Sequence, residues 1–475
     1  MPRPLPQYQK IAKHLRESIE SGRLTPGARL PSVRRLAEEH EVSLLTALQA
    51  LRLLEQERYV HARPKSGFYV RPARQNEPPA TAPEPLDIAP LDEQAETHLS
   101  IMGTPCRIRL DLANGEPALY PVKRLGILMR QQIYRDAGLL GSHIRGTGYP
   151  MLKQEITRRA LDYGCDLDPR ELLITNGCIE SLALALRAVT QPGDAVAVES
   201  PTYFVIFQML RNLRLKVVEI PTSATGMDLN ALEKLLASRH IAAVLCIANA
   251  NNPTGVTLPM THKHKLVELA RRYEIALIED DIYGDTYFGT MRPKPLRSLS
   301  DQVILCSSFS KTLAPGIRVG WVAGGRWASR IASLKYTSSM ATPIYPQAAI
   351  AEFLRTGGYD HHLRRLRQTL ANQIRHMRAA ILRHFPAGTQ ISAPSGGYVL
   401  WVRLPEGSAG TRPLFEQARA EGIGIAPGHL FATDERFDHH LRLNAGFGWN
   451  PMVDAAIARL AQMIEAAPPK TARGT

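Results

Sequence analysis

One lysine in the sequence stands among hydroxyl side chains directly after the short apolar run 303–306. Lys311 follows Ser308 and Ser310, and Arg318 lies seven residues further on. A lysine held in such surroundings can form a Schiff base with an aldehyde, and hydroxyls with a guanidinium suit a phosphate dianion. The segment therefore indicates covalent binding of a phosphorylated aldehyde, although a surface lysine in a serine-rich turn would show the same pattern.

Two polar segments upstream also follow apolar runs. Asp280 and Tyr283 come after the run that ends at Ile278, and Asn252 lies in the turn-forming segment 249–255. A buried carboxylate beside a pyridine nitrogen would keep that nitrogen protonated, and an asparagine could donate to a phenolate oxygen. Helix capping or turn formation alone would also explain these residues.

A glycine joins an apolar run to a helical stretch within residues 175–180. Gly177 precedes Cys178 and Ile179, whose backbone N–H groups would be unpaired donors at a helix N-terminus. Such a junction can hold an anion, so it predicts a place for the phosphate. Alone it is a weak signal.

Short β-branched runs alternate with helical stretches after residue 170, and these elements must position the polar segments. The seven runs are 172–175, 195–198, 216–220, 243–247, 276–278, 303–306 and 319–322. This alternation predicts an α/β fold with a mostly parallel, doubly wound sheet. Ligands bind at the carboxyl ends of strands in such sheets.

In their order along the chain, the four polar segments resemble the fold-type I aminotransferases, which bind pyridoxal 5'-phosphate. The resemblance covers about residues 108–465 and implies a mostly parallel seven-stranded sheet with a smaller α+β subdomain. It implies a catalytic set of Lys311 as the Schiff-base lysine, Asp280 at the pyridine nitrogen and Tyr203 stacked on the ring. The further cofactor ligands that it implies are Asn252 and Tyr283 at the phenolate oxygen, and Gly177, Cys178, Ile179, Ser308, Ser310 and Arg318 at the phosphate.

Three more positions bear on the ligand. Arg442 matches the arginine that binds a substrate α-carboxylate in this family, which implies an amino acid as substrate or effector. His143 stands where the family usually has a tyrosine that reaches a phosphate across the dimer interface, and Ile179 stands where it often has glutamine. Cofactor binding should survive on the other contacts, but these two departures count against efficient transamination.

The first 74 residues carry about half of the positive excess of the chain. They contain 14 Lys and Arg against 7 Asp and Glu, and the whole chain has a net charge of +14. Helical spacing from Tyr8 to Ile19, candidate caps at Ser32 and Ser43, and two short strands predict a helix-turn-helix followed by a β wing. The charge suits nucleic acid, although a solvated surface would also explain it.

Residues 26–37, Val42-Ser43 and 67–70 resemble the GntR-type winged helix, which covers residues 6–70. That family places its third helix in the major groove of DNA. The contacts implied are Arg34, Arg35, Ser43, Thr46, Gln49, Lys65 and Gly67. The family commonly has arginine after the recognition-helix serine, whereas this chain has Leu44, so the base preference stays open.

Residues 71–105 are rich in Pro, Ala and Glu and predict a linker, which leaves domains at 6–70 and 106–468. Winged helix, linker and aminotransferase-like domain in this order match the MocR subfamily of GntR regulators. The resemblance implies a transcriptional regulator that senses pyridoxal phosphate, or an amino acid or amine, through aldimine exchange at Lys311. The alternatives are an aminotransferase with an accessory DNA-binding domain and, third, a DNA-binding protein with an inactive shell used only to dimerise.

The composition limits other classes of function. The sequence has no cysteine pair or histidine cluster at metal-ligand spacing and no apolar run near the ~20 residues that span a membrane, so we expect neither a metal site nor membrane insertion. We expect a cytoplasmic homodimer, because fold-type I sites are usually completed by a second subunit and winged helices of this kind read paired half-sites. Its expected partners are double-stranded DNA and an amino acid or amine. The five cysteines are at positions 106, 165, 178, 246 and 306.

Overall fold

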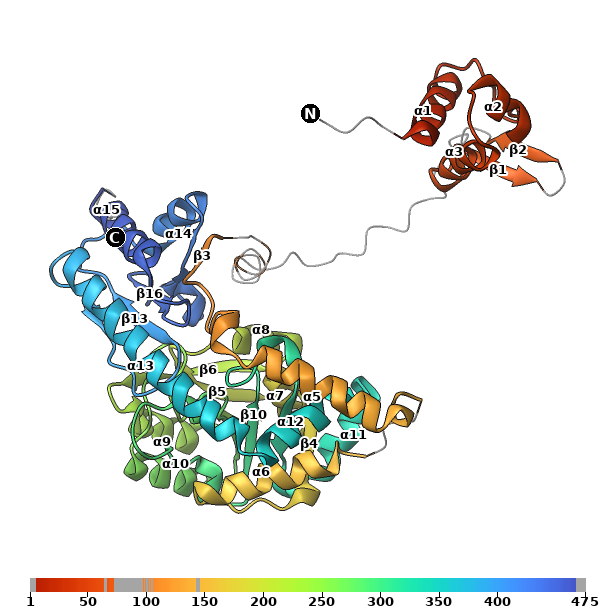
Figure 1. Cartoon of the computed structure of the whole chain (residues 1–475). Helices are drawn as coiled ribbons and strands as arrows, with labels where there is room; N and C mark the ends of the chain where they lie inside the picture. Colours follow the sequence, from red (N-terminus) through yellow and green to blue (C-terminus); the bar gives the residue numbers. More distant parts are fainter. Residues whose placement is uncertain are drawn as a thin grey trace. The chain divides into compact units, whose positions relative to one another are not determined.

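The computed structural model describes residues 6–63, 66–71, 97, 99, 101, 103, 106–141 and 146–466. The chain divides into two compact units, residues 1–90 and 91–475, each of which is described by itself (Figure 1). Lys65, His143 and most of the predicted linker lie outside the described residues. What the sequence predicts for them therefore stays a prediction.

The N-terminal unit forms the predicted helix-turn-helix and hairpin. Ser32 caps the second helix by accepting a hydrogen bond from Arg35 N–H at 3.2 Å. Ser43 caps the third in the same way, from Thr46 N–H at 3.1 Å. The elements are α1 (Gln7–Glu20), α2 (Val33–Glu39), α3 (Leu44–Gln56), β1 (Val60–Arg63) and β2 (Gly67–Val70), with β1 antiparallel to β2.

A single large sheet organises the second unit. It contains all seven predicted strands and an eighth, the two-residue edge strand β7, which the sequence did not predict. Its order is β4-β11-β10-β9-β8-β5-β6-β7. The pairs among β10, β9, β8, β5 and β6 are parallel, whereas β11 is antiparallel to both of its neighbours, which confirms a mostly parallel sheet. The strands are β4 (Leu172–Thr175), β5 (Ala195–Ser200), β6 (Lys216–Ser223), β7 (Gly226–Met227), β8 (Ala243–Cys246), β9 (Ala276–Asp280), β10 (Val303–Ser308) and β11 (Gly320–Ala323).

Helices cover both faces of this sheet. On β9, Ile278 packs in an apolar cluster with α7, whereas its neighbour Leu277 packs on the opposite face with α9 and α10. Successive side chains of a strand alternate in this way, so both faces need apolar residues. The helices are α5 (Val122–Arg135), α6 (Pro150–Asp162), α7 (Cys178–Val189), α8 (Val205–Asn212), α9 (Leu229–Ser238), α10 (Met260–Arg272), α11 (Ala328–Ser338) and α12 (Ile344–Arg355).

A smaller sheet and the C-terminal helices form the α+β subdomain that the sequence predicts. The sheet has the order β12-β13-β16-β15, and β14 pairs with β3 beside it. The long helix α13 leads into this subdomain and packs against α15 (Figure 1). The elements are β3 (Ile108–Arg109), α13 (Gly358–His384), β12 (Gln390–Ile391), β13 (Val399–Arg403), α14 (Thr411–Ala420), β14 (Ile423–Gly424), β15 (Ala426–Pro427), β16 (His440–Asn444) and α15 (Pro451–Ala466).

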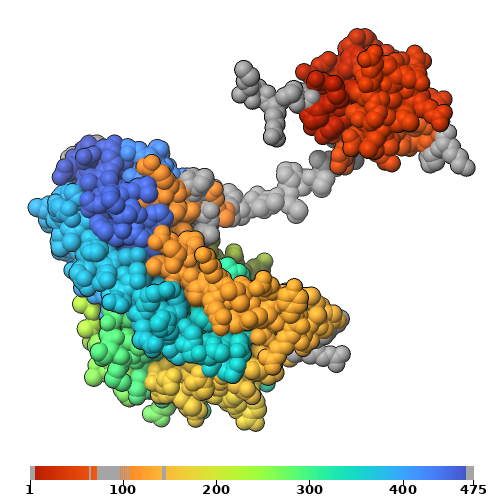
Figure 2. All heavy atoms as spheres, in the orientation of Figure 1, coloured from red at the N-terminus to blue at the C-terminus, as the bar shows by residue number. Residues whose placement is uncertain are grey.

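Short 3-10 helices connect these elements. They are η1 (Pro117–Leu119), η2 (Ala137–Leu140), η3 (Pro169–Glu171), η4 (Gly284–Thr286), η5 (Leu296–Ser298), η6 (Pro315–Ile317), η7 (Gly325–Trp327) and η8 (Gly428–Phe431). Helix α5 packs beside α12 at the surface of the second unit (Figure 2). Within the described residues, no helix combines the length and apolar character needed to cross a membrane.

Candidate functional site

A cavity of about 260 Å³ lies at the carboxyl ends of β5, β8, β9 and β10. Its volume is near the lower end of the range for small-molecule sites, roughly 300–1,000 Å³. Of the twelve residues that the sequence predicts for cofactor and substrate, ten line it. They are Cys178, Ile179, Tyr203, Asn252, Asp280, Tyr283, Ser310, Lys311, Arg318 and Arg442.

Asp280 faces the cavity because of its register on β9. It lies two residues after Ile278 and therefore points to the same face, toward α7. Its Oδ1 accepts hydrogen bonds from the Cys178 thiol at 3.2 Å and from Ile282 N–H at 3.1 Å. Burial raises the pKa of the Asp280 carboxyl to about 6. A cation beside it, such as a protonated ring nitrogen, would stabilise its ionised form.

Two side chains from later in the sequence hold the main chain at Lys311. The carbonyl oxygen of Lys311 accepts a hydrogen bond from the Tyr398 hydroxyl, and the carbonyl of Thr312 accepts one from His362 Nε2 at 2.6 Å. Burial, together with the positive charge of Arg442, lowers the pKa of the Lys311 amine to about 8. A far larger fraction of this amine is therefore neutral near pH 7 than for an exposed lysine, as nucleophilic attack on an aldehyde requires.

The start of α7 forms a cradle for an anion. Gly177 has a φ of 103°, in the left-handed region. A Cβ there would lie 2.6 Å from Nη2 of Arg318, so a larger residue would push the guanidinium away from the first turn. The same Nη2 donates to the carbonyl of Asn176 at 2.8 Å. Free N–H groups at the helix N-terminus and the guanidinium beside them both favour a phosphate.

Two predicted phosphate ligands do not line the cavity. Gly177 lies at the junction just described. Ser308 Oγ lies 2.9 Å from Ser310 Oγ and 3.0 Å from the carbonyl of Val319. Ser308 also accepts from Ser310 N–H at 3.1 Å. In this arrangement Ser308 orients Ser310, which does line the cavity.

Arg442 is buried and lines the cavity. Its Nη1 donates to Asn252 Oδ1 at 3.0 Å and its Nη2 to the carbonyl of Asp111. The rings of Phe204 and Phe431 lie 5.6 Å and 5.3 Å from the guanidinium carbon. Nε has no hydrogen-bond partner among the described residues although it is buried. A buried guanidinium with an unsatisfied donor favours an anionic ligand such as a carboxylate.

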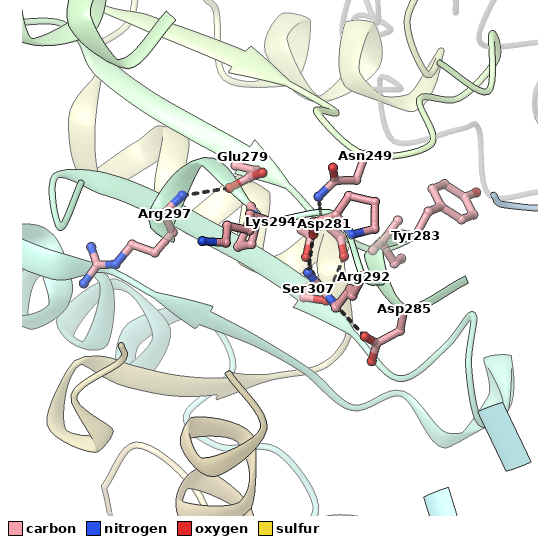
Figure 3. Close-up of polar contacts among 12 residues, drawn as sticks. Asn249, Glu279, Asp281, Tyr283, Asp285, Arg292, Lys294, Arg297 and Ser307 are labelled. Carbon is pink, nitrogen blue, oxygen red and sulfur yellow. Dashed lines mark hydrogen bonds and ion pairs between the residues drawn. The ribbon is translucent and has the colours of Figure 1, made fainter. Parts of the chain in front are cut away.

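Sequence reasoning missed the charged network behind the cavity (Figure 3). Arg292 pairs with Asp281 and, at 2.7 Å, with Asp285. Asp281 also accepts from Asn249 Nδ2 at 2.7 Å. Asp281 follows Asp280 directly, and Asn249 begins the loop that carries Asn252. The network therefore ties together the two loops that carry these cavity residues. The acidic run 279–281 was its only sequence signal.

The wall formed by Asp111, Ala113 and Asn114 was also missed. These residues line the cavity, and the carbonyl of Ala113 accepts from the Tyr283 hydroxyl at 3.4 Å. They lie outside any strand of the sheet, so the rule that ligands bind at strand ends could not locate them. Phe204 was missed as well, although it directly follows Tyr203.

The predicted DNA contacts lie on the N-terminal unit. Arg34 and Arg35 are exposed on α2, and Arg35 pairs with Glu39 at 2.8 Å. Gly67 begins β2 with a φ of 116°. Three further residues predicted to contact DNA lie at the cap and in the first two turns of α3: Ser43, Thr46 and Gln49. Lys65 lies outside the described residues.

The sheet, the subdomain and the lysine-centred cavity define the class of the large unit. The family model of the class I and II aminotransferases matches residues 109–460, and that of the gntR family of bacterial regulatory proteins matches residues 7–70. Class I and II aminotransferases depend on pyridoxal 5'-phosphate. The chain belongs to the GntR-family transcriptional regulators that carry an aminotransferase class I and II domain, consistent with the MocR-like subfamily.

Relatives and solved structures agree with this assignment. The HTH-type transcriptional regulator YdcR of Escherichia coli is 37% identical over 468 residues, which cover 97% of this chain and 99% of YdcR. The kynurenine aminotransferase of Pyrococcus horikoshii is 25% identical with a TM-score of 0.73, and the match covers 79% of this chain and 95% of that one. The α-aminoadipate aminotransferase of Thermus thermophilus, complexed with N-(5'-phosphopyridoxyl)-L-leucine, is 25% identical with a TM-score of 0.70, over 75% and 91%.

Proposed function

We propose that this protein is a transcriptional regulator that binds DNA through residues 6–70 and carries pyridoxal 5'-phosphate on Lys311. The observation that carries the proposal is the setting of Lys311: a half-buried lysine whose amine has a lowered pKa, in a cavity that Asp280 and the first turn of α7 also line. GntR-family regulators bind DNA, and the relative YdcR matches both units of this chain.

The residues around the cavity fit the parts of the cofactor. When bound, pyridoxal 5'-phosphate supplies an aldehyde that condenses with amines and a ring that withdraws electrons. Lys311 would hold the aldehyde carbon, and Asp280 would hold a proton on the ring nitrogen. The remaining contacts would be Tyr203 on the ring, Asn252 and Tyr283 at the phenolate oxygen, and the first turn of α7 with Ser310 and Arg318 at the phosphate.

Arg442 suggests the kind of effector. Its unpartnered Nε and its place in the same cavity as Lys311 suit an amino acid whose carboxylate meets the guanidinium while its amine replaces that of Lys311. An amine without a carboxylate should then perturb the protein less. The released lysine amine and the altered charge would be the signal that changes DNA binding.

The relatives favour a regulator over a working aminotransferase. YdcR matches both units, whereas the solved aminotransferases match 75–79% of this chain. We further propose a homodimer, since winged helices of this kind read paired half-sites and fold-type I sites are usually completed by a second subunit. We place it in the cytoplasm, where its DNA is.

Absorption spectroscopy tests the cofactor. The purified protein should absorb visible light as pyridoxal proteins do, and borohydride should trap the cofactor on the chain. Lys311→Ala should lose both properties, while Lys216→Ala, which removes an exposed lysine of β6, should keep them. A colourless wild-type protein after incubation with pyridoxal 5'-phosphate would contradict the proposal.

DNA footprinting tests the regulatory role. The full-length protein should protect sites upstream of its own gene or of neighbouring genes, and protection should change when amino acids are added. Arg442→Lys should keep the visible absorption but lose the bidentate carboxylate contact, which weakens the response to amino acids about tenfold or more. Multiple turnover of an amino acid with a keto acid at about 1–1,000 per second would instead favour the aminotransferase alternative.

A further inference from the structure

Two leucines at the start of α3 are unusually exposed. Leu44 and Leu45 have 54% and 66% of their surface accessible, and no other large apolar side chain among the described residues of this unit is as exposed. The inner face of the helix is built from Ala47, Leu51 and Leu54, which are fully buried. The leucines are therefore not needed for the core of the unit.

The helix geometry places further residues beside them. At 100° per residue, Leu45, Gln49 and Arg52 fall on the face opposite the buried one, with Leu48 at its edge. Gln49 and Arg52 are exposed, and Leu48 is half-buried. The outer face of α3 thus begins with apolar side chains and continues with an amide and a guanidinium.

The hydroxyl groups at this helix start are already satisfied. Ser43 Oγ accepts from Thr46 N–H at 3.1 Å and lies 2.8 Å from Thr46 Oγ1. The two residues with hydrogen-bonding side chains in this turn therefore bond each other. The leucine methyl groups remain as the most exposed part of the turn.

Exposed charges elsewhere in the N-terminal unit bear on the partner of the leucines. Arg34, Arg35 and Arg63 are exposed on α2 and β1. Arg34 forms no ion pair with any residue that the structure describes. The excess of positive charge in this unit suits phosphates. In a helix-turn-helix the first turns of the second helix meet base edges in the major groove. The apolar group that base edges present there is the C5-methyl of thymine.

We propose that Leu44 and Leu45 contact thymine methyl groups in the major groove and so make the protein select A·T pairs. The inference rests on the proposed DNA binding and deepens it by naming the bases. Gln49, one turn after Leu45, has the side chain that pairs with adenine through two hydrogen bonds, which extends the same preference.

Deoxyuridine substitution isolates the methyl group. Full-length protein would first select sites from a random duplex library, and each thymine of a selected half-site would then be replaced by deoxyuridine. Loss of a contacted methyl should weaken binding about fourfold, measured by fluorescence anisotropy at fixed salt concentration. Leu45→Ala should bind the thymine and deoxyuridine duplexes more nearly equally, whereas Leu382→Ala, also 66% exposed but on α13, should keep the wild-type ratio.

The outcomes separate this inference from the proposed function. If no duplex is selected and binding shows no salt dependence, the proposed DNA binding itself fails. If selected duplexes bind but thymine and deoxyuridine are equivalent for the wild-type protein, DNA binding stands and the methyl contact is refuted. If Leu44→Ala and Leu45→Ala change the sedimentation coefficient but not the deoxyuridine effect, the leucines contact protein, which also overturns the inference.

Discussion

At the scale of single residues, the protonation state of the Lys311 amine decides whether it can attack an aldehyde. Burial and the charge of Arg442 lower its pKa to about 8. Below that pH the amine is mostly protonated and cannot attack an aldehyde, and above it the amine is mostly neutral. An ordinary lysine, with a pKa of about 10.4, would stay mostly protonated up to pH 10.

The rate of pyridoxal 5'-phosphate capture by the cofactor-free protein should follow this titration. We expect it to rise about tenfold per pH unit well below pH 8 and to level off above it, because the neutral amine is the nucleophile. Stopped-flow absorbance between pH 6 and pH 9.5 measures it. Arg442→Gln should move the midpoint to higher pH, since the cation that disfavours the protonated amine is gone, whereas the exposed-site change Glu406→Gln should not. A rate that keeps rising tenfold per unit beyond pH 9 would refute a lowered pKa.

At the scale of elements, the sequence predicts features that depend on neighbouring residues, but it does not predict pairings between residues far apart in the chain. The strands and the caps Ser32 and Ser43 could be predicted because they depend on neighbours within a few residues. Asp280 could be placed because it ends an apolar run. Arg292 could not, because its pairing with Asp281 depends on how the loop after β9 folds back, which no local pattern records.

Arg292→Met should show how much that network stabilises the elements. It leaves the buried carboxylate of Asp281 without its ion-pair partner, while Asp285 keeps Arg159 at 3.9 Å. The free energy of unfolding should therefore fall by about 3–5 kcal/mol. Urea denaturation at pH 7 measures it. The control Arg170→Met breaks an exposed pair with Asp168 and should cost about 0–1 kcal/mol. Equal losses for the two variants would mean that the buried network adds nothing.

At the scale of the whole molecule, the surface around α5 bears on assembly. Tyr134 on α5 and Leu140 in η2 are 85% and 71% exposed, and Ile133 beside them is also exposed. Single exposed apolar side chains are ordinary, but several within one segment indicate an interaction surface. This segment ends just before His143, the position that the family resemblance leads us to expect at the dimer interface.

Sedimentation equilibrium should therefore find twice the chain mass of 52.6 kDa. Tyr134→Asp combined with Leu140→Asp should place two charges on the proposed interface and shift the protein to monomers. If the second subunit completes the site, the visible absorption should fall as the dimer dissociates. Leu382→Asp, at a similarly exposed leucine of α13, is the control and should leave the mass unchanged. A double variant that remains dimeric would show that the interface lies elsewhere on the protein.

The hydrogen bonds on the carbonyls of Lys311 and Thr312 have a mechanical consequence. Tyr398 lies just before β13 and His362 near the start of α13, so the peptide that carries the lysine is anchored to two segments that lead into the smaller subdomain. When the lysine amine is displaced, only its side chain is released, and the anchored peptide stays in place. A movement of Tyr398 or His362 would have to carry this peptide along or break its hydrogen bond. The two bonds would therefore link the position of the lysine to the position of both segments.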